Sequence, residues 1–247
     1  MWTDAVSGFA HVGLEELDQL SLMNRTDTKY IFHERVLEDL LLKLQPYYRM
    51  LEIRQQRMMK YHSVYFDTPG HFLYHCHHNG KRARYKVRLR DYLVSDISFF
   101  EIKKKNNKNQ TRKKRMQVPF RTADMGEDTA AFVTRHTPLF PAELCTSLEN
   151  TFTRMTLAGF ETQERITIDT EMSYDLAGLK KELPGLVIAE VKRSGHGGNS
   201  PVTRVLHELG VMPGGFSKYC MGIVTMQDGV KYNRFKPKIN QLKKILL

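Results

Sequence analysis

The feature that most constrains the fold is residues 82–92, RARYKVRLRDY, where cations alternate with larger or apolar side chains. Successive side chains of a β-strand point to opposite faces, so a strand here gathers its cations on one face. These cations are Arg84, Lys86, Arg88 and Arg90. Same-face neighbours lie roughly 7 Å apart, within the Debye length of about 8–10 Å, so they repel each other unless an anion lies along the row. The segment is therefore either a solvated outer face or an anion-binding face.

Several other segments share this strand pattern, with a cation on one face and apolar residues on the other. The predicted strands, at least eight in number, are drawn from residues 24–32, 47–53, 58–66, 82–92, 97–105, 111–119, 148–157, 163–170 and 186–191. A hairpin signal at Asn79-Gly80 precedes the basic strand, which favours antiparallel pairing. Apolar spacing and capping residues predict helices over 33–44, 124–136 and 200–209, and a short final helix capped by Ser217. We therefore expect an α+β protein.

The recurrence of cations on one face of strand after strand allows two architectures. An open sheet would present a basic platform, whereas a closed barrel would enclose a basic tunnel and pack its apolar outer face on helices. We expect the second, an antiparallel closed β-barrel of about eight strands flanked by helices, because a tunnel focuses the electric field on a linear polyanion.

Composition indicates an anionic partner and a reducing compartment. Lys and Arg number 38 against 27 Asp and Glu, which gives a net charge of +11 and a pI near 9.5. Cys76, Cys145 and Cys220 are scattered without a CxxC pair, which is typical of free, buried thiols in a cytoplasmic protein. No stretch of 18 apolar residues occurs, so we expect a soluble chain without a transmembrane segment.

Two single residues stand out from their surroundings. Glu190 lies in the otherwise apolar strand LVIAEV, where a carboxylate is costly unless it is paired or bound to a cation. Lys218 lies in the first turn of the final predicted helix, where a cation is unfavourable to the helix dipole unless an anion compensates. Both residues therefore predict a charged partner.

Other segments leave alternatives open. The histidines of residues 71–78 fit either a metal site or, more simply, a surface helix or loop before the turn at residues 79–80. The basic run in residues 111–115 fits a nucleic-acid patch or a hairpin arm of the sheet. Residues 194–200 (SGHGGNS) lack the ending of a Walker loop and are expected to be flexible. We divide the chain into a covering segment (1–21), the main domain (22–227) and a basic C-terminal tail or peripheral helix (228–247).

Seven sequence strings carry a resemblance to a known family. They are YFDT at residues 65–68, then RYKVRLRDY, FEIKKK, TFTRMTL, ERITID, AEVK and FSKY. In this order and spacing they resemble the VTC domain, the polyphosphate polymerase domain of the vacuolar transporter chaperone complex and its bacterial relatives, within the CYTH-like triphosphate tunnel metalloenzyme superfamily. The resemblance covers residues 22–225. It implies a tunnel barrel whose basic lumen holds triphosphate or polyphosphate together with Mn²⁺ or Mg²⁺.

The resemblance also assigns roles to residues. It implies a catalytic set of Arg88, Arg90, Lys103, Arg154 and Arg165. It implies phosphate binding by Lys29, Ser217 and Lys218, to which we add Lys86 from the basic row and Lys192 beside Glu190. The metal-binding glutamate of the family corresponds to Glu190. Two departures weaken phosphate contacts: Phe152 replaces a tyrosine, and Gly215 stands where a basic residue precedes FSKY.

We expect a polymerase that extends polyphosphate from ATP. Hydrolytic relatives carry an acidic ExExK strand near the N-terminus, where this chain has RTDTK. Chain extension needs no general base, whereas hydrolysis needs an activated water. The alternatives are a triphosphatase of the same fold and a non-catalytic module that binds polyphosphate or RNA. RNA is disfavoured because Tyr85, which could stack on bases, lies on the face opposite the basic row.

Overall fold

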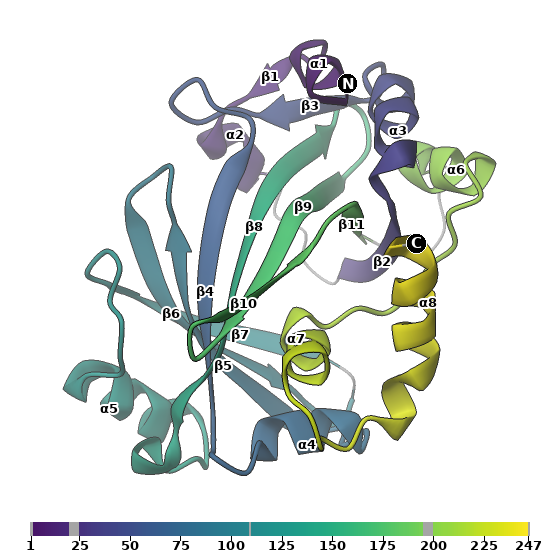
Figure 1. Ribbon diagram of the computed structural model, residues 1–247. Coiled ribbons are helices and arrows are strands. Elements are labelled where there is room, and N and C mark those ends of the chain that lie inside the picture. Colours follow the sequence, from purple (N-terminus) through teal and green to yellow (C-terminus); the bar gives the residue numbers. More distant parts are fainter. Residues whose placement is uncertain (1, 20–24, 109, 195–199, 247) are drawn as a thin grey trace.

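A computed structural model describes the chain except residues 1, 20–24, 109, 195–199 and 247, so most of the expected loop at 194–200 and the boundary at 21/22 lie outside the described residues. One large sheet is surrounded by helices (Figure 1). Its strands are β1 (His11–Val12), β2 (Arg25–His33), β3 (Tyr48–Leu51), β4 (Met59–Asp67), β5 (Arg84–Tyr92), β6 (Ile97–Lys105), β7 (Thr111–Val118), β8 (Cys145–Gly159), β9 (Glu164–Leu176), β10 (Leu179–Leu183) and β11 (Leu186–Ser194). The helices are α1 (Trp2–Ser7), α2 (Leu14–Gln19), α3 (Leu37–Leu44), α4 (Phe72–His78), α5 (Glu127–His136), α6 (Pro201–Glu208), α7 (Lys218–Met226) and α8 (Lys236–Leu246).

The sheet is antiparallel along its main path and open at its ends. Its strands follow the order β2-β11-β9-β8-β4-β5-β6-β7, with β10 beside β9 and β3 beside β8. The expected closed barrel is not confirmed, because β2 and β7 are not paired in the described part of the chain. The free edge of β2 is instead met by the segment before α7: the Gly214 amide donates to the Lys29 carbonyl oxygen at 2.7 Å, and Tyr30 bridges to Pro213.

One face of the sheet packs on helices through apolar side chains, as the alternation predicts. The α3 residues Leu37, Leu40, Leu41 and Leu44 are fully buried against strands β2, β8, β9 and β11, and α1 and α6 join this core. Farther along, Val133 of α5 packs on β4, β5 and β6. In Figure 1, α3 and α6 lie beside β2 while α5 lies at the far end near β6.

The other face holds the final helices. α7 packs closely on β8 and β9: a Cβ on Gly222 would meet the Leu148 side chain and would lie 2.7 Å from a ring carbon of Tyr174. Asp67, the acid of the YFDT string, fixes the adjoining elements, because its buried carboxylate accepts from the Leu73 and Tyr74 amides of α4 and from the Tyr219 hydroxyl of α7. The same face therefore carries both α7 and the cations described below.

The predicted elements are largely confirmed. The strands and helices occur at the expected places, but β8 and β9 are longer than predicted, and β10 was not predicted at all. Its sequence LKKEL alternates weakly and all but Leu183 is exposed, so no apolar stripe marks it. The three cysteines are free thiols, of which Cys145 is exposed rather than buried. No helix in the described ranges is long and apolar enough to span a bilayer.

Candidate functional site

Nine cations converge on the face of the sheet that carries α7, and we call them the interior basic cluster. They come from seven elements: Lys29 of β2, Lys86, Arg88 and Arg90 of β5, Lys103 of β6, Lys113 of β7, Arg154 of β8, Lys192 of β11 and Lys218 of α7. Eight of these nine were predicted as site residues, and the other, Lys113, was not.

The sheet curls strongly enough for distant strands to face each other. Burial lowers the pKa of Lys103 well below its ordinary value, and Arg88 and Arg90 lower it further. Glu190 acts on the same pKa in the opposite direction, although β11 and β6 lie five places apart in the sheet. The two ends of the sheet therefore share one electrostatic interior, although no strand pairing joins them among the described residues.

Three carboxylates lie within this cluster, and each is held between two cations. Glu101 pairs with Arg88 at 2.5 Å and with Lys113. Asp169 pairs with Arg154 at 2.5 Å and with Lys218. Glu190 accepts from Lys29 and Lys192, both at 2.9 Å. The expected charged partners of Glu190 and Lys218 are thus identified.

These pairs keep the carboxylates ionised. Burial alone would raise the pKa of Glu101, but Arg88, Arg90 and Lys113 outweigh it and hold the pKa well below its ordinary value. The cations beside Asp169 and Glu190 depress the pKa of each in the same way. Nine cations against three carboxylates leave a large positive charge in a partly desolvated space, and an anion is the ligand that balances it.

Three cations in the cluster make no ion pair with a carboxylate of the described residues. Arg90 is 6% exposed and donates from Nε to the Ser63 hydroxyl at 3.2 Å. Lys86 donates to the Ser217 hydroxyl at 2.9 Å, and Ser217 in turn caps α7 by accepting from the Cys220 amide. Lys103 has no carboxylate partner either. These three are the cations with most to gain from a bound anion.

The aromatic ring of Phe152 lies against several cations of the interior basic cluster. Its ring stacks on Tyr61 with centroids 5.2 Å apart. Arg90, Arg154 and Lys218 lie 5.4, 5.2 and 4.3 Å from its centroid, so the quadrupole of the ring partly offsets their repulsion. Although Phe152 lacks the hydroxyl of the tyrosine expected at this position, its ring still interacts with three cations.

One predicted site residue points elsewhere. Arg165 lies opposite Lys192 in the register, but its guanidinium donates to the Leu17 carbonyl oxygen of α2, toward the N-terminal segment. Ser217, by contrast, lies at the cluster through its contact with Lys86.

The histidine-rich segment forms α4, so the simpler interpretation was right about a helix but wrong about its exposure, because Leu73, Tyr74, Cys76 and His78 are buried. His78 is buried, and its Nε2 accepts from the Arg234 amide at 3.2 Å. The His77 Nδ1 lies 3.1 Å from the Cys220 sulfur. In the described part of the chain, no group of three or more His, Cys, Asp or Glu side chains is arranged to hold a metal ion. The histidines connect α4 to its neighbours instead.

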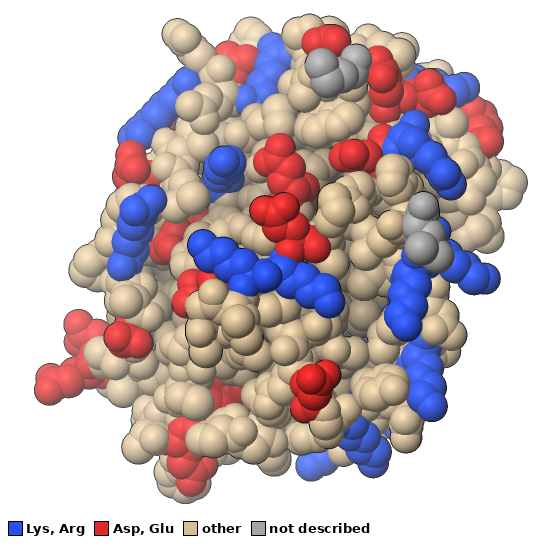
Figure 2. All heavy atoms as spheres, viewed as in Figure 1, with Lys and Arg blue, Asp and Glu red and all other residues tan. Residues whose placement is uncertain are grey.

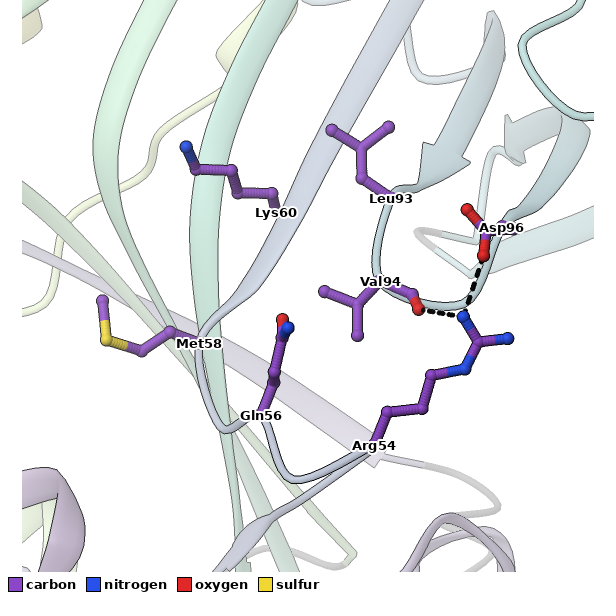
Figure 3. A pocket seen from close by; sticks show the side chains of 7 residues that line it. All are labelled: Arg54, Gln56, Met58, Lys60, Leu93, Val94 and Asp96. Carbon is purple, nitrogen blue, oxygen red and sulfur yellow. Dashed lines mark hydrogen bonds and ion pairs between the residues drawn. The ribbon is translucent and has the colours of Figure 1, made fainter.

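A pocket of about 440 Å³ lies away from this cluster, between residues 54–60 and the turn after β5 (Figure 3). It contains the ion pair between Arg54 and Asp96, whose side chains are 61% and 57% exposed. Its lining consists of Arg54, Gln56, Met58, Lys60, Leu93, Val94 and Asp96. Because its charged side chains are solvated and two of the three already pair with each other, we do not assign the site to this pocket.

Sequence reasoning missed the two most buried carboxylates of the site. Asp169 shares a strand face with Arg165 in ERITIDT, and Glu101 shares one with Lys103 in FEIKKK, so alternation places both on the basic face. Lys113 was hidden in a run of four cations, where alternation alone does not single out one residue. Its ion pair with Glu101 identifies it only in three dimensions.

Comparison with solved structures defines the class. The fold resembles a putative adenylate cyclase from Bacillus halodurans, with a TM-score of 0.50, 14% identity, and coverage of 79% of this chain and 96% of that one. It also resembles a putative adenylyl cyclase from Hippeastrum, described as revealing a dominant triphosphatase activity, with a TM-score of 0.50, 13% identity, and coverage of 84% and 98%. The chain thus shares the fold of these two proteins.

The family follows from the sequence itself. The model of the VTC domain matches residues 24–227, so this chain belongs to the VTC domain family. The resemblance found in the seven strings is confirmed. No curated protein matches the chain.

Proposed function

We propose that this protein is a polyphosphate polymerase that transfers the terminal phosphate of ATP to a growing polyphosphate chain. The observation that carries the proposal is that three carboxylates of the interior, Glu101, Asp169 and Glu190, are each paired with two cations. A carboxylate so strongly stabilised in its ionised form is a poor proton acceptor, so Glu101, Asp169 and Glu190 are unsuited to activate water.

Chain extension does not require a base. The attacking group is a terminal phosphate oxygen, which is already anionic, and it forms a new P–O bond to the γ-phosphorus as the bond to ADP breaks. The difficulty is to hold two repelling anions in line and to stabilise charge on the transferring group. Arg90, Lys103 and Lys86 are suited to this role because they have no carboxylate partner among the described residues.

We further propose that Mn²⁺ or Mg²⁺ binds at Glu190. Its carboxylate is ionised and partly exposed, so it supplies one hard oxygen ligand of the kind these ions prefer. Since no three-residue ligand group occurs in the described ranges, phosphate oxygens would have to complete the coordination. Bound there, the ion would neutralise phosphate charge. Lys29 and Lys192, which share the same carboxylate oxygen, would then be free to contact phosphate.

A second candidate is hydrolysis of triphosphate or a nucleoside triphosphate. It is favoured by the likeness to the Hippeastrum protein, which is described as a triphosphatase. A non-catalytic polyphosphate-binding module is the third. The three candidates differ in their products. The polymerase forms polyphosphate, the hydrolase forms free phosphate, and the binding module forms neither.

The test is incubation of the purified protein with ATP and Mn²⁺, with separate assays of polyphosphate and free phosphate. The polymerase produces polyphosphate, and Glu190→Gln abolishes that product while a Glu208→Gln control, at an exposed carboxylate of α6, retains it. Free phosphate without polymer would instead assign the hydrolase. Tight triphosphate binding without either product would assign the binding module.

A further inference from the structure

A second group of cations lies where β5 begins and β6 ends. Arg84 and Lys105 are paired in the register at this end of the sheet, Lys86 follows on β5, and Lys238 comes from α8. We call Arg84, Lys86, Lys105 and Lys238 the mouth cluster. Lys86 belongs to both clusters, so the mouth cluster continues the interior basic cluster outward. None of the four forms an ion pair with a carboxylate in the described part of the chain.

The four cations act on a shared space. Burial and then Lys86, Arg84, Lys238 and Lys105 lower the pKa of His77 to about 2. Lys86, Arg84 and Lys238 also act together on the Cys220 thiol, whose pKa burial raises. Cations from β5, β6 and α8 therefore lie at the same end of the interior, and no acidic side chain among the described residues pairs with them.

The ammonium of Lys238 lies beside Gly215. Position 215, just before FSKY, is a glycine, and a Cβ built there would lie 3.0 Å from the Lys238 Nζ. Gly215 is adjacent to Gly214, whose amide binds the Lys29 carbonyl oxygen, and is two residues from Ser217, which binds Lys86. The ammonium of Lys238 thus lies near the part of the mouth cluster that adjoins the interior basic cluster.

The C-terminal segment is anchored so that Lys238 is held there. Phe235 packs on the rings of Tyr74, His77 and His78 at centroid distances of 6.0, 6.0 and 5.3 Å. The Tyr74 hydroxyl donates to the Lys231 carbonyl oxygen at 2.8 Å. Lys238 follows Phe235 by three residues, about one helical turn. Figure 2 shows cations along the side of the molecule where α8 lies in Figure 1.

We propose that the mouth cluster is a second anion subsite, which binds the part of a linear polyphosphate chain that extends beyond the interior basic cluster, and that Lys238 supplies the charge absent at position 215. This inference rests on the proposed function and adds to it a preference for long chains over triphosphate. It also gives α8, which follows the region matched by the family, a role in binding.

The experiment compares triphosphate with long-chain polyphosphate by calorimetric titration. Lys238→Gln is expected to weaken long-chain binding about 3- to 10-fold, because Lys238 is half-buried and solvent screens its contact, and to change triphosphate affinity less than about 2-fold. Lys238→Arg, which keeps the charge, is expected to bind both ligands like the wild type. Lys244→Gln removes an exposed cation from the same helix and is the matched control, expected to change neither affinity.

Three results would overturn the inference. One is unchanged long-chain affinity in Lys238→Gln. Another is an equal loss in Lys238→Gln and Lys244→Gln, which would indicate net charge rather than a subsite. The third is an equal loss for triphosphate and the long chain, which would place Lys238 in the central site. Failure of the proposed function is recognised separately, because a wild type that binds long-chain polyphosphate but forms no polymer from ATP and Mn²⁺ would contradict the polymerase and leave the subsite standing.

Discussion

At the scale of single residues, the carboxylates of the interior act as internal counter-ions. Asp169 is almost fully buried and holds Arg154 and Lys218. A buried carboxylate between two buried cations is favourable mainly because removing it leaves those cations without a partner. In the absence of an external anion, Asp169 therefore stabilises the fold, and a phosphate would compete for the same cations.

Asp169→Asn tests this role. We expect it to lower the free energy of unfolding by about 3–5 kcal/mol, the usual cost of leaving buried charges unpaired, and saturating triphosphate should restore more stability to the variant than to the wild type. Urea unfolding with and without triphosphate measures both effects. The control is Glu208→Gln, which removes an exposed carboxylate near Lys43 and Arg204 and should change stability by less than about 1 kcal/mol. An equal response to triphosphate in wild type and Asp169→Asn would contradict the counter-ion role.

Lys218 predicts a pH dependence of anion binding. Burial lowers the pKa of its ammonium to about 8, although Asp169 acts in the opposite direction. Because the cation is lost as pH rises through its pKa, triphosphate affinity should be highest below about pH 7 and should fall between about pH 7 and 9. Lys218→Arg keeps its charge over this range and should show a flatter profile. Identical profiles for the two proteins would remove Lys218 from the binding site.

At the scale of elements, the site depends on how closely α7 approaches the sheet. Ser217 caps the helix, and Lys218 in its first turn is tolerated because the Asp169 carboxylate lies beside it. The sequence predicted this helix and its cap, because capping signals are local. It did not predict that α7 packs on the basic face, because Gly222 reveals that contact only once Leu148 and Tyr174 are placed.

Gly222→Ala tests the close approach. Its added methyl group would collide with Leu148 and Tyr174, so we expect a loss of stability of about 1–3 kcal/mol and weaker triphosphate binding, because Lys218 moves with the helix. Gly70→Ala is the control, since nothing lies within 4 Å of a Cβ built there. Thermal unfolding and calorimetry on both variants measure the effect. If the two variants behave alike, the packing of α7 does not position the site.

At the scale of the whole molecule, the alternation of side chains along each strand predicted which residues share a face of the sheet. It did not predict whether the sheet closes into a barrel. The period of two along each strand determines which side chains share a face, so Lys29, Arg88, Lys103, Arg154 and Lys192 could be placed together from the sequence. Whether the end strands pair depends on what else occupies their edges. Here residues 213–214 bind along the edge of β2, and no local sequence pattern predicts that contact. The approach of Lys238 to position 215 was missed for the same reason, because α8 reaches that position only through the fold.

The most direct test of the proposed anion-binding interior is triphosphate titration of the Arg90→Met/Lys103→Met double variant beside the wild type. Arg90 is buried, Lys103 is half-buried, and neither has a carboxylate partner in the described chain. At about 1.5–3 kcal/mol per charge-assisted contact, we predict at least a 100-fold loss of affinity together with an unchanged or higher thermal midpoint of the ligand-free protein. Wild-type affinity in the double variant would contradict the claim that this interior is an anion-binding site.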